Sequence, residues 1–290
     1  MKKILFISII SIAVVALTLN LKPVKETIKN VSKGIISHQS LIYQDSLTIH
    51  SRVKVPEGFK RVKYPKGSFE NYIRHYNLKP YGSTIVNYDG SEYYWQKGHI
   101  GILDITVPKN GLQQCADALI RVRSEYLWAA NRKQDIGFNF TSGHHCSWHK
   151  YAQGYRPKIN GNKVTFSKTA SANHTKENFY NYLNLIYMYS GTLSLSQELK
   201  PITSANNLKI GDLLIKGGSP GHIVMLGDEA INKNGDKLFL LFQGNTPAQS
   251  VHLVKNLEDA KISPWYSLRT NTVIPVSNYT FYNSKFARFK

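Results

Sequence analysis

Residues 208–249 read LKIGDLLIKGGSPGHIVMLGDEAINKNGDKLFLLFQGNTPAQ, and this stretch carries the clearest pattern in the chain. Asp212–Lys216 is a short apolar run that ends at the turn residues Gly217–Pro220. A second apolar and β-branched run then begins at His222 and continues to Leu226. Two such runs on either side of a turn predict two strands, the second of which opens with His222.

A hairpin turn follows this second strand. Asn232–Asp236 contains an Asn-Gly pair, and both residue types tolerate the positive φ that tight hairpins require. Lys237–Gln243 is then the return strand. The two arms have similar lengths, so an antiparallel pairing predicts that His222 and Gln243 lie side by side at one edge of a sheet.

A second anchor lies about a hundred residues earlier, at Cys115. Pro108–Gly111 breaks the apolar strand predicted at His99–Val107. Apolar residues then recur at helical spacing up to Leu127, which predicts a long helix with Cys115 in its first turn. Unpaired N–H groups and the positive end of the helix dipole favour a thiolate at that position.

This order of residues predicts acyl transfer. Cys115 is the candidate nucleophile and attacks an amide or peptide carbonyl, while His222 takes up the thiol proton and later protonates the leaving amine. Gln243 is the candidate partner of the second imidazole nitrogen, and Asn245 is the alternative. A cysteine at a helix start, a histidine at a strand start and a polar side chain on the next strand form the arrangement of papain-like cysteine hydrolases.

The oxyanion hole is the remaining part of such a site. The N–H of Cys115 and the side chain of Gln113 or Gln114 are the candidate donors. Removal of one donor of this kind typically lowers the rate by about 10²–10³.

Two resemblances follow from these residues. Gln114-Cys115 at a helix start, Gly211-Asp212 at a strand start and Gly221–Val224 resemble the CHAP and NlpC/P60 group of bacterial cell-wall amidases and peptidases. This resemblance implies an α+β papain-like fold, with the long helix packed on an antiparallel sheet and an insert between Cys115 and His222.

The second resemblance covers most of the chain, from about Val55 to the C-terminus. The chain is similar there to a bacterial domain of unknown function of the DUF4846 type, which implies a family but no activity. The segments that carry the likeness are Gln113–Tyr126, Phe138–Gly143, Gln153–Pro157 and Ser263–Tyr266.

The N-terminal segment predicts export. Met1–Lys3 is basic and Ile4–Leu19 is apolar, which is typical of a signal peptide or an uncleaved membrane anchor within residues 1–21. Residues 22–54 are expected to form a tether, and 55–290 a single domain. The rest of the chain would then lie outside the cytoplasm, in the periplasm or beyond it, with the N-terminal segment in the membrane.

The charge balance indicates an anionic partner. The chain has 290 residues, of which 37 are Lys or Arg and 18 are Asp or Glu, for a net charge of +19. Export argues against nucleic acid, so an anionic envelope surface or a cell-wall peptide or glycan is the expected partner. Solubility alone is the simpler explanation of the same charge.

Two cysteines leave further possibilities open. Cys115 and Cys146 could form a disulfide in an oxidising compartment, which would abolish the proposed chemistry. His145 and His149 have i,i+4 spacing beside Cys146, but no acidic residue lies among them. We therefore expect neither a metal nor any other cofactor.

Two further elements have a clear pattern. Thr175–Ser190 predicts a helix with one apolar stripe, which we assign to the core. Ser250–Val254 predicts a strand on which His252 alternates with apolar residues. We therefore expect His252 to face solvent rather than to act in catalysis.

An alternative to catalysis is an inactive protein that binds envelope glycan or peptide. It would keep the papain-like frame and use Trp148, Tyr155 and Trp265 as aromatic walls of a cleft. Aromatic residues make up 12% of the chain, including 18 Tyr, which suits such a surface. The reactivity of Cys115 toward iodoacetamide separates the two hypotheses, because only a catalytic site needs an activated thiol.

Overall fold

The computed structural model describes residues 41–290. The predicted signal or anchor segment and the first part of the predicted tether lie outside the described residues. Within residues 41–290, no helix is both long enough and apolar enough to cross a membrane.

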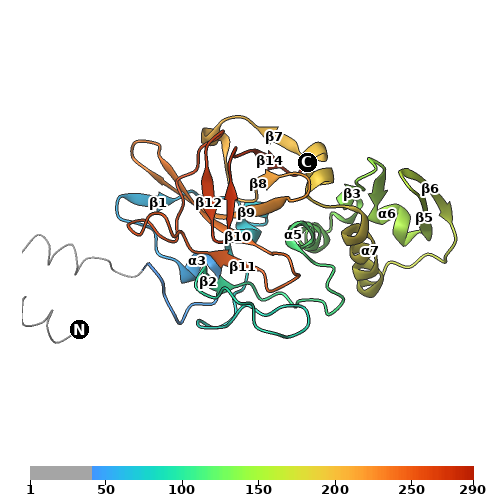
Figure 1. The fold of residues 1–290 in the computed structure, drawn as a ribbon, viewed down its shortest axis with the longest axis horizontal. Coiled ribbons are helices and arrows are strands. Elements are labelled where there is room, and N and C mark those ends of the chain that lie inside the picture. Colours follow the sequence, from blue (N-terminus) through green and yellow to red (C-terminus); the bar gives the residue numbers. More distant parts are fainter. Residues whose placement is uncertain (1–40) are drawn as a thin grey trace, which may run out of the picture. The chain divides into compact units, whose positions relative to one another are not determined.

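An antiparallel sheet of eight strands forms the centre of the described chain (Figure 1). Its order is β2-β11-β10-β9-β8-β14-β7, and β1 pairs with the far half of β9. The strands are β1 (Phe59–Arg61), β2 (His99–Ile102), β7 (Lys200–Ile202), β8 (Leu213–Lys216), β9 (His222–Asn232), β10 (Lys237–Gln243), β11 (His252–Val254) and β14 (Phe286–Arg288). The mixed composition of helices and mostly antiparallel strands confirms the predicted class at this level.

The meander predicted in residues 208–249 is present. Strands β8, β9 and β10 pair in succession, with Lys216 opposite His222 and Lys237 opposite Ile231. β9 is longer than predicted because it continues through Asp228 and Glu229 to the hairpin turn. Both acidic side chains are buried there, and a pattern based on apolar residues alone ends the strand before them.

A β-bulge at Gly227 changes the side-chain alternation of β9. Leu241 pairs with Leu226, whereas Leu240 pairs with Asp228, so Gly227 has no partner on β10. Before the bulge, Ile223 and Met225 face the larger apolar cluster; after it, the even-numbered Ala230 faces that cluster. The bulge therefore turns Asp228 to the same face of the sheet as Ile223 and Met225.

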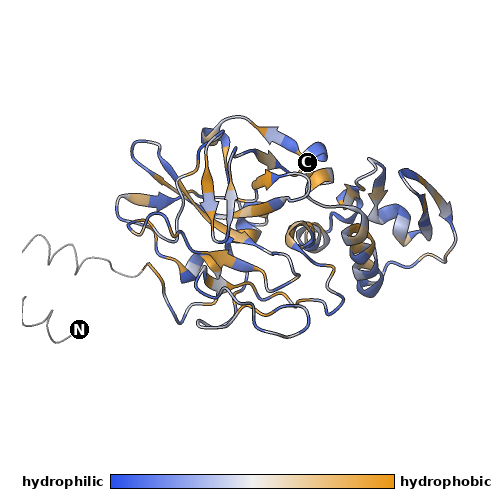
Figure 2. Cartoon of the chain, in the orientation of Figure 1, coloured by the Kyte–Doolittle hydropathy of each residue, from blue (hydrophilic) through white to orange (hydrophobic). Residues whose placement is uncertain are grey.

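Helix α5 (Cys115–Ala129) packs against β9 and β10 (Figure 1). From Cys115 to Leu127 every residue except Glu125 is buried, because the sheet lies on one side of the helix and α7 on another. Figure 2 shows the apolar central strands beside this helix. The long helix thus begins at Cys115 as predicted; in residues 41–114, α3 (Ile49–Arg52) and α4 (Phe69–Arg74) are much shorter.

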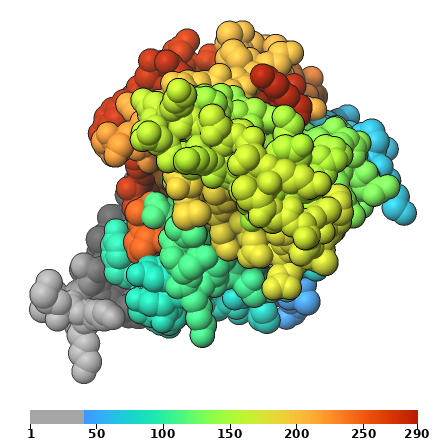
Figure 3. Space-filling model, turned by 90° about the vertical axis from the view of Figure 1, so that its right-hand side faces the viewer, coloured from blue at the N-terminus to red at the C-terminus, as the bar shows by residue number. Residues whose placement is uncertain are grey.

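An insert between α5 and β8 contains most of the remaining elements. It lies at the right of Figure 1 and forms much of the face seen in Figure 3. Trp148 lies at its centre, against the rings of Phe179 and Tyr182. The elements of this region are η1 (Lys133–Asp135), β3 (Gly137–Asn139), β4 (His145–Ser147), α6 (Trp148–Ala152), β5 (Tyr155–Asn160), β6 (Lys163–Lys168), α7 (Lys176–Tyr189), α8 (Thr192–Glu198) and η2 (Ala205–Asn207), with β7 leaving it for the main sheet.

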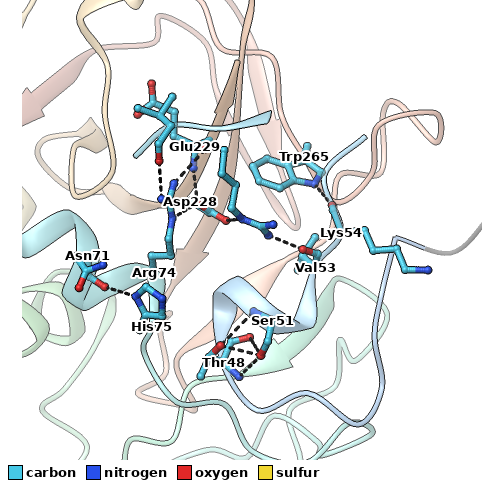
Figure 4. Close-up of polar contacts among 12 residues, drawn as sticks. Thr48, Ser51, Val53, Lys54, Asn71, Arg74, His75, Asp228, Glu229 and Trp265 are labelled. Carbon is cyan, nitrogen blue, oxygen red and sulfur yellow. Dashed lines mark hydrogen bonds and ion pairs between the residues drawn. The ribbon is translucent and has the colours of Figure 1, made fainter. Parts of the chain in front are cut away.

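The described part of the predicted tether belongs to the folded domain. Residues 41–54 include α3, and Val53 next to it is buried. Trp265 donates its indole N–H to the carbonyl of Lys54 over 2.8 Å, as Figure 4 shows. The folded unit therefore includes Leu41 onward and begins before the predicted boundary at residue 55. The sequence pattern did not indicate this, because the segment is largely polar and only a few apolar residues in it pack against the domain.

A buried ionic network holds this N-terminal region against β9 (Figure 4). The carboxylate of Asp228 is fully buried and accepts from Arg61 Nε and Arg74 Nε, each over 2.6 Å. Arg74 also donates to the carbonyls of Val62 and Glu229. Since the two guanidinium groups share one carboxylate and also donate to main-chain carbonyls, the network fastens β1 and α4 to the sheet.

Candidate functional site

Cys115 is the first residue of α5, and its side chain lies next to the beginning of β9. Only 8% of the residue is exposed, and the main-chain N–H of Ile223 is near enough to act on the pKa of its thiol. Gly244 makes the close approach possible, because a Cβ there would lie 2.8 Å from Ala118 Cβ and 3.1 Å from the carbonyl oxygen of Gln114. The thiol is thus held beside the stretch of main chain that carries His222.

The electrostatics favour a neutral thiol at rest. Burial raises the pKa of Cys115 to about 11, and the nearby carboxylate of Asp117 adds to this, while N–H groups of the helix start and of Ile223 act in the opposite direction. Burial also raises the pKa of Asp117 to about 7, although its Oδ2 accepts from the N–H of Gln114. The helix start alone therefore does not produce a resting thiolate.

His222 and Gln243 meet at the edge of the meander, as predicted. His222 Nε2 lies 2.8 Å from Gln243 Oε1, and both residues are buried. Burial lowers the pKa of His222, and the hydrogen bond to Gln243 opposes that shift. Because an amide oxygen only accepts, Nε2 carries the proton of the neutral ring and Nδ1 keeps its lone pair.

Asn245 is not the partner of His222. Its amide donates to the hydroxyl of Tyr93 and, over 3.5 Å, to Asn278. Between the two candidate partners in the sequence, the structure selects Gln243 because the strand ends there and the chain then turns away.

A short hairpin covers the imidazole. It consists of β12 (Ile274–Val276) and β13 (Tyr279–Phe281), which pair only with each other. The ring of Tyr279 lies 4.7 Å from the ring of His222, centroid to centroid, and that of Phe281 lies 5.9 Å away. Burial raises the pKa of the Tyr279 phenol, and the proximity of Cys115 acts in the same direction. This aromatic cover was not predicted, since the basic, aromatic C-terminal segment has no pattern that points to the site.

His252 is buried, in contrast to the prediction that it faces solvent. It is 2% exposed, and its Nε2 lies 3.3 Å from Gln243 Nε2. β11 is an interior strand between β10 and β2. The ring of His99, on β2, lies against the ring of His252, with 6.2 Å between the two ring centroids. The alternation of His252 with apolar residues does not predict its burial, because strands with one solvent-exposed face show the same alternation.

The two candidate oxyanion residues have different environments. Gln113 is fully buried, and its Oε1 accepts from Arg121 Nη1 over 2.8 Å. Its Nε2 is buried and has no hydrogen-bond partner within residues 41–290, so the prediction that this amide serves an oxyanion hole stays a prediction. Gln114 is exposed at the start of α5, and its Oε1 accepts from the hydroxyl of Thr246.

The predicted aromatic walls do not line one cleft. Trp148 is 2% exposed in the core of the insert, and Trp265 is fully buried beneath the N-terminal region. Tyr155 is partly exposed on the hairpin of β5 and β6. Large aromatic residues in this chain were thus mistaken for binding surface when two of the three fill the core.

The second cysteine is separate from this site. Cys115 and Cys146 are both free, and Cys146 is buried on β4 in the insert. His145, next to it, is exposed, because successive residues of a strand point to opposite faces. Within residues 41–290, no group of three or more His, Cys, Asp or Glu side chains is arranged to hold a metal ion.

Comparison with known proteins yields a family. A family model described as a domain of unknown function (4846) matches residues 49–288, in agreement with the resemblance over most of the chain. A search of curated proteins found no match. A search of solved structures found none either.

Proposed function

The chain belongs to the family described as domain of unknown function (4846), and from the arrangement of its own residues we propose that it is a cysteine hydrolase with a papain-like site that cleaves an amide bond. The observation that carries the proposal is the 2.8 Å contact between His222 Nε2 and Gln243 Oε1, beside a cysteine at a helix start. In this arrangement Gln243 holds the imidazole while Nδ1 remains free to accept a proton.

The chemistry begins from a neutral thiol and a neutral imidazole. His222 Nδ1 takes the proton of Cys115 as the sulfur attacks the substrate carbonyl, so the charge separation arises only as the C–S bond forms. The resulting imidazolium donates its proton to the amine, which departs as the C–N bond breaks and leaves the acyl group as a thioester on Cys115. Water, deprotonated by the same ring, then attacks the thioester and regenerates the thiol.

Two features of the site support transition-state stabilisation. The N–H of Cys115 lies at the start of α5, where the helix dipole is positive. The exposed amide of Gln114 is the neighbouring side chain that could turn its NH₂ group toward a developing oxyanion. Loss of the Gln114 amide is expected to lower the rate by about 10²-fold if it acts in this way.

Thiol alkylation tests the proposal without knowledge of the substrate. The chain offers a matched pair of variants, because Cys146→Ala leaves only Cys115 and Cys115→Ala leaves only Cys146. Iodoacetamide should modify Cys115 in the Cys146→Ala chain, and the further change His222→Ala should slow that reaction. Equal rates with and without His222 would remove the imidazole from the mechanism.

The substrate class in this proposal is a peptide or glycan-linked peptide of the bacterial cell envelope. The charge of +19 supports an anionic surrounding, and residues 136–176 contain no Asp or Glu. The exposed residues Lys150, Lys158 and Lys163 lie in this acid-free segment. It contributes to the face shown in Figure 3.

We also propose an extracytoplasmic location, with the N-terminal segment as a membrane anchor, because residues 1–21 combine a basic start with an apolar run. Cell fractionation tests the location, and release of new amino groups from purified cell-wall fragments tests the reaction. Full-length protein in the cytoplasmic fraction would contradict the location. Cell-wall fragments that stay intact would contradict the reaction.

An inactive binding protein is the second candidate, and the burial of the site favours it. Cys115 is 8% exposed with its pKa raised to about 11, and Tyr279 covers the imidazole. A protein that only binds would keep a thiol of this kind inert. The same alkylation experiment separates the candidates, since an inert Cys115 that is accessible only on unfolding supports binding.

A further inference from the structure

We propose that His252 is a positioning residue that fixes the amide of Gln243 and, through it, the tautomer of His222. The role in catalysis rests on the proposed function, whereas the tautomer itself does not. Three hydrogen bonds carry the inference: His252 Nδ1 to the carbonyl of Ser250 at 2.9 Å, Gln243 Nε2 to His252 Nε2 at 3.3 Å, and His222 Nε2 to Gln243 Oε1 at 2.8 Å.

Only one assignment of protons satisfies this chain. A carbonyl oxygen accepts, so His252 Nδ1 must carry the proton and Nε2 must be a lone pair. That lone pair requires the NH₂ end of Gln243, which leaves Oε1 toward His222. The oxygen in turn requires a proton on His222 Nε2, and Nδ1 is left as the base.

The reverse orientation of the amide would be unfavourable. If Gln243 turned its oxygen to His252, two lone pairs would face one another in a buried site, where no water compensates them. Its NH₂ group would then face His222 and favour a proton on Nδ1. In that form the imidazole could not take up the proton of Cys115.

The surroundings keep His252 in its neutral form. Burial lowers its pKa to about 4, and the nearby rings of His99 and His222 act in the same direction. These two histidines come from β2 and β9, and Gln243 from β10 is uncharged. The lone pair on His252 Nε2 is thus available at any pH near neutrality.

A role limited to packing would not need this chemistry. His252 is 2% exposed on an interior strand, where an apolar residue avoids the cost of burying two ring nitrogens. Both nitrogens are instead hydrogen bonded, and one of them to the residue that holds the candidate base.

Nitrogen-15 NMR of the histidine rings is the direct test, because it distinguishes the two tautomers without any substrate. In the unmodified chain, His222 should carry its proton on Nε2. In His252→Leu the two tautomers should approach comparable populations, and the rate of Cys115 alkylation should fall about twofold, because only about half of the rings then keep the lone pair on Nδ1. An unchanged His222 tautomer in a folded His252→Leu chain would overturn the proposal.

Three further variants separate positioning from packing. His252→Gln keeps an acceptor at this site and should give the same His222 tautomer and the same alkylation rate as the unmodified chain. This variant keeps the proposal testable if His252→Leu folds poorly. Gln243→Glu presents an acceptor to His222 in either orientation and places a carboxylate oxygen against the lone pair of His252, so in that background His252→Leu should no longer lower the rate. His99→Leu removes the adjacent ring on β2 but no member of the chain, and should leave the tautomer in place.

The possible outcomes also separate this inference from the proposed function. A correct tautomer that depends on His252, with an unreactive Cys115, would retain the inference on positioning and refute the hydrolase. A reactive Cys115 with a tautomer that is indifferent to residue 252 would do the opposite.

Discussion

Replacing Asp228→Asn should unfold the domain at a markedly lower temperature, because it leaves two buried guanidinium groups without their anion. The carboxylate is fully buried and accepts from Arg61 and Arg74 over 2.6 Å each. The side chains of these arginines are 18% and 6% exposed, so water compensates little. Removal of one partner of a buried ion pair typically costs about 3–5 kcal/mol.

The chain provides its own control for this experiment. Asp135 accepts from Arg132 over 2.7 Å, nearly the same distance, but the two side chains are 39% and 49% exposed. Asp135→Asn should therefore cost less than about 1 kcal/mol. For a domain of this size, about 4 kcal/mol corresponds to a loss of roughly 8–16 °C in Tm, against a few degrees for the control.

Thermal and urea unfolding of both variants give the comparison, with the urea midpoint as the measure that is independent of Tm. Equal, small losses in the two variants would refute the argument, since burial is the only large difference between the two pairs. A loss in Asp228→Asn that is confined to local opening of the N-terminal region would show instead that this region folds independently of β9.

Three other variants test the site. Asp117→Asn should lower the pKa of Cys115, seen as thiolate absorbance at lower pH. In the unmodified chain, stability should fall as the pH rises from about 4 to about 7, because the Asp117 carboxyl, with a pKa raised to about 7 in the fold, binds its proton more tightly there than in the unfolded chain. Asp117→Asn should abolish this loss. Stability against urea that is flat with pH in the unmodified chain would contradict this. Gly244→Ala should destabilise the fold by about 1–3 kcal/mol in urea, since the added methyl group overlaps with the start of α5; a neutral effect would show that the helix can shift. Tyr279→Ala should uncover His222 and speed the alkylation of Cys115, while an unchanged rate would mean that the hairpin does not limit access.

The local signals in the sequence predicted the parts of the site that depend on turns and helix starts. The break at Pro108–Gly111 correctly indicated where α5 begins, and the Asn-Gly hairpin where β10 begins. The register pairs Phe242 with Met225, so His222 meets Gln243 as a diagonal neighbour of this hairpin rather than as a direct partner. These are effects of a few neighbouring residues, which a sequence displays directly.

Burial on both faces of a strand could not be predicted in the same way. His252 alternates with apolar residues as a solvent-facing residue would, and it is buried because β11 lies between two other strands. Trp148 and Trp265 are in the core for the same kind of reason, because segments distant in sequence pack over them. The raised pKa of Cys115 is also a product of this packing, since the helix start alone favours the opposite shift.

The bulge at Gly227 has a consequence for the length of β9. Without it, strict alternation would turn Asp228 to the opposite face of the sheet, among residues such as Val224 and Leu226, and away from its two arginines. Deleting Gly227 would instead keep the faces of the strand, because Asp228 would then follow Leu226 directly and still point to its two arginines. When chains of this family are aligned, a one-residue gap at this point is therefore compatible with the same charge partners, whereas a strand of full length without the bulge is not.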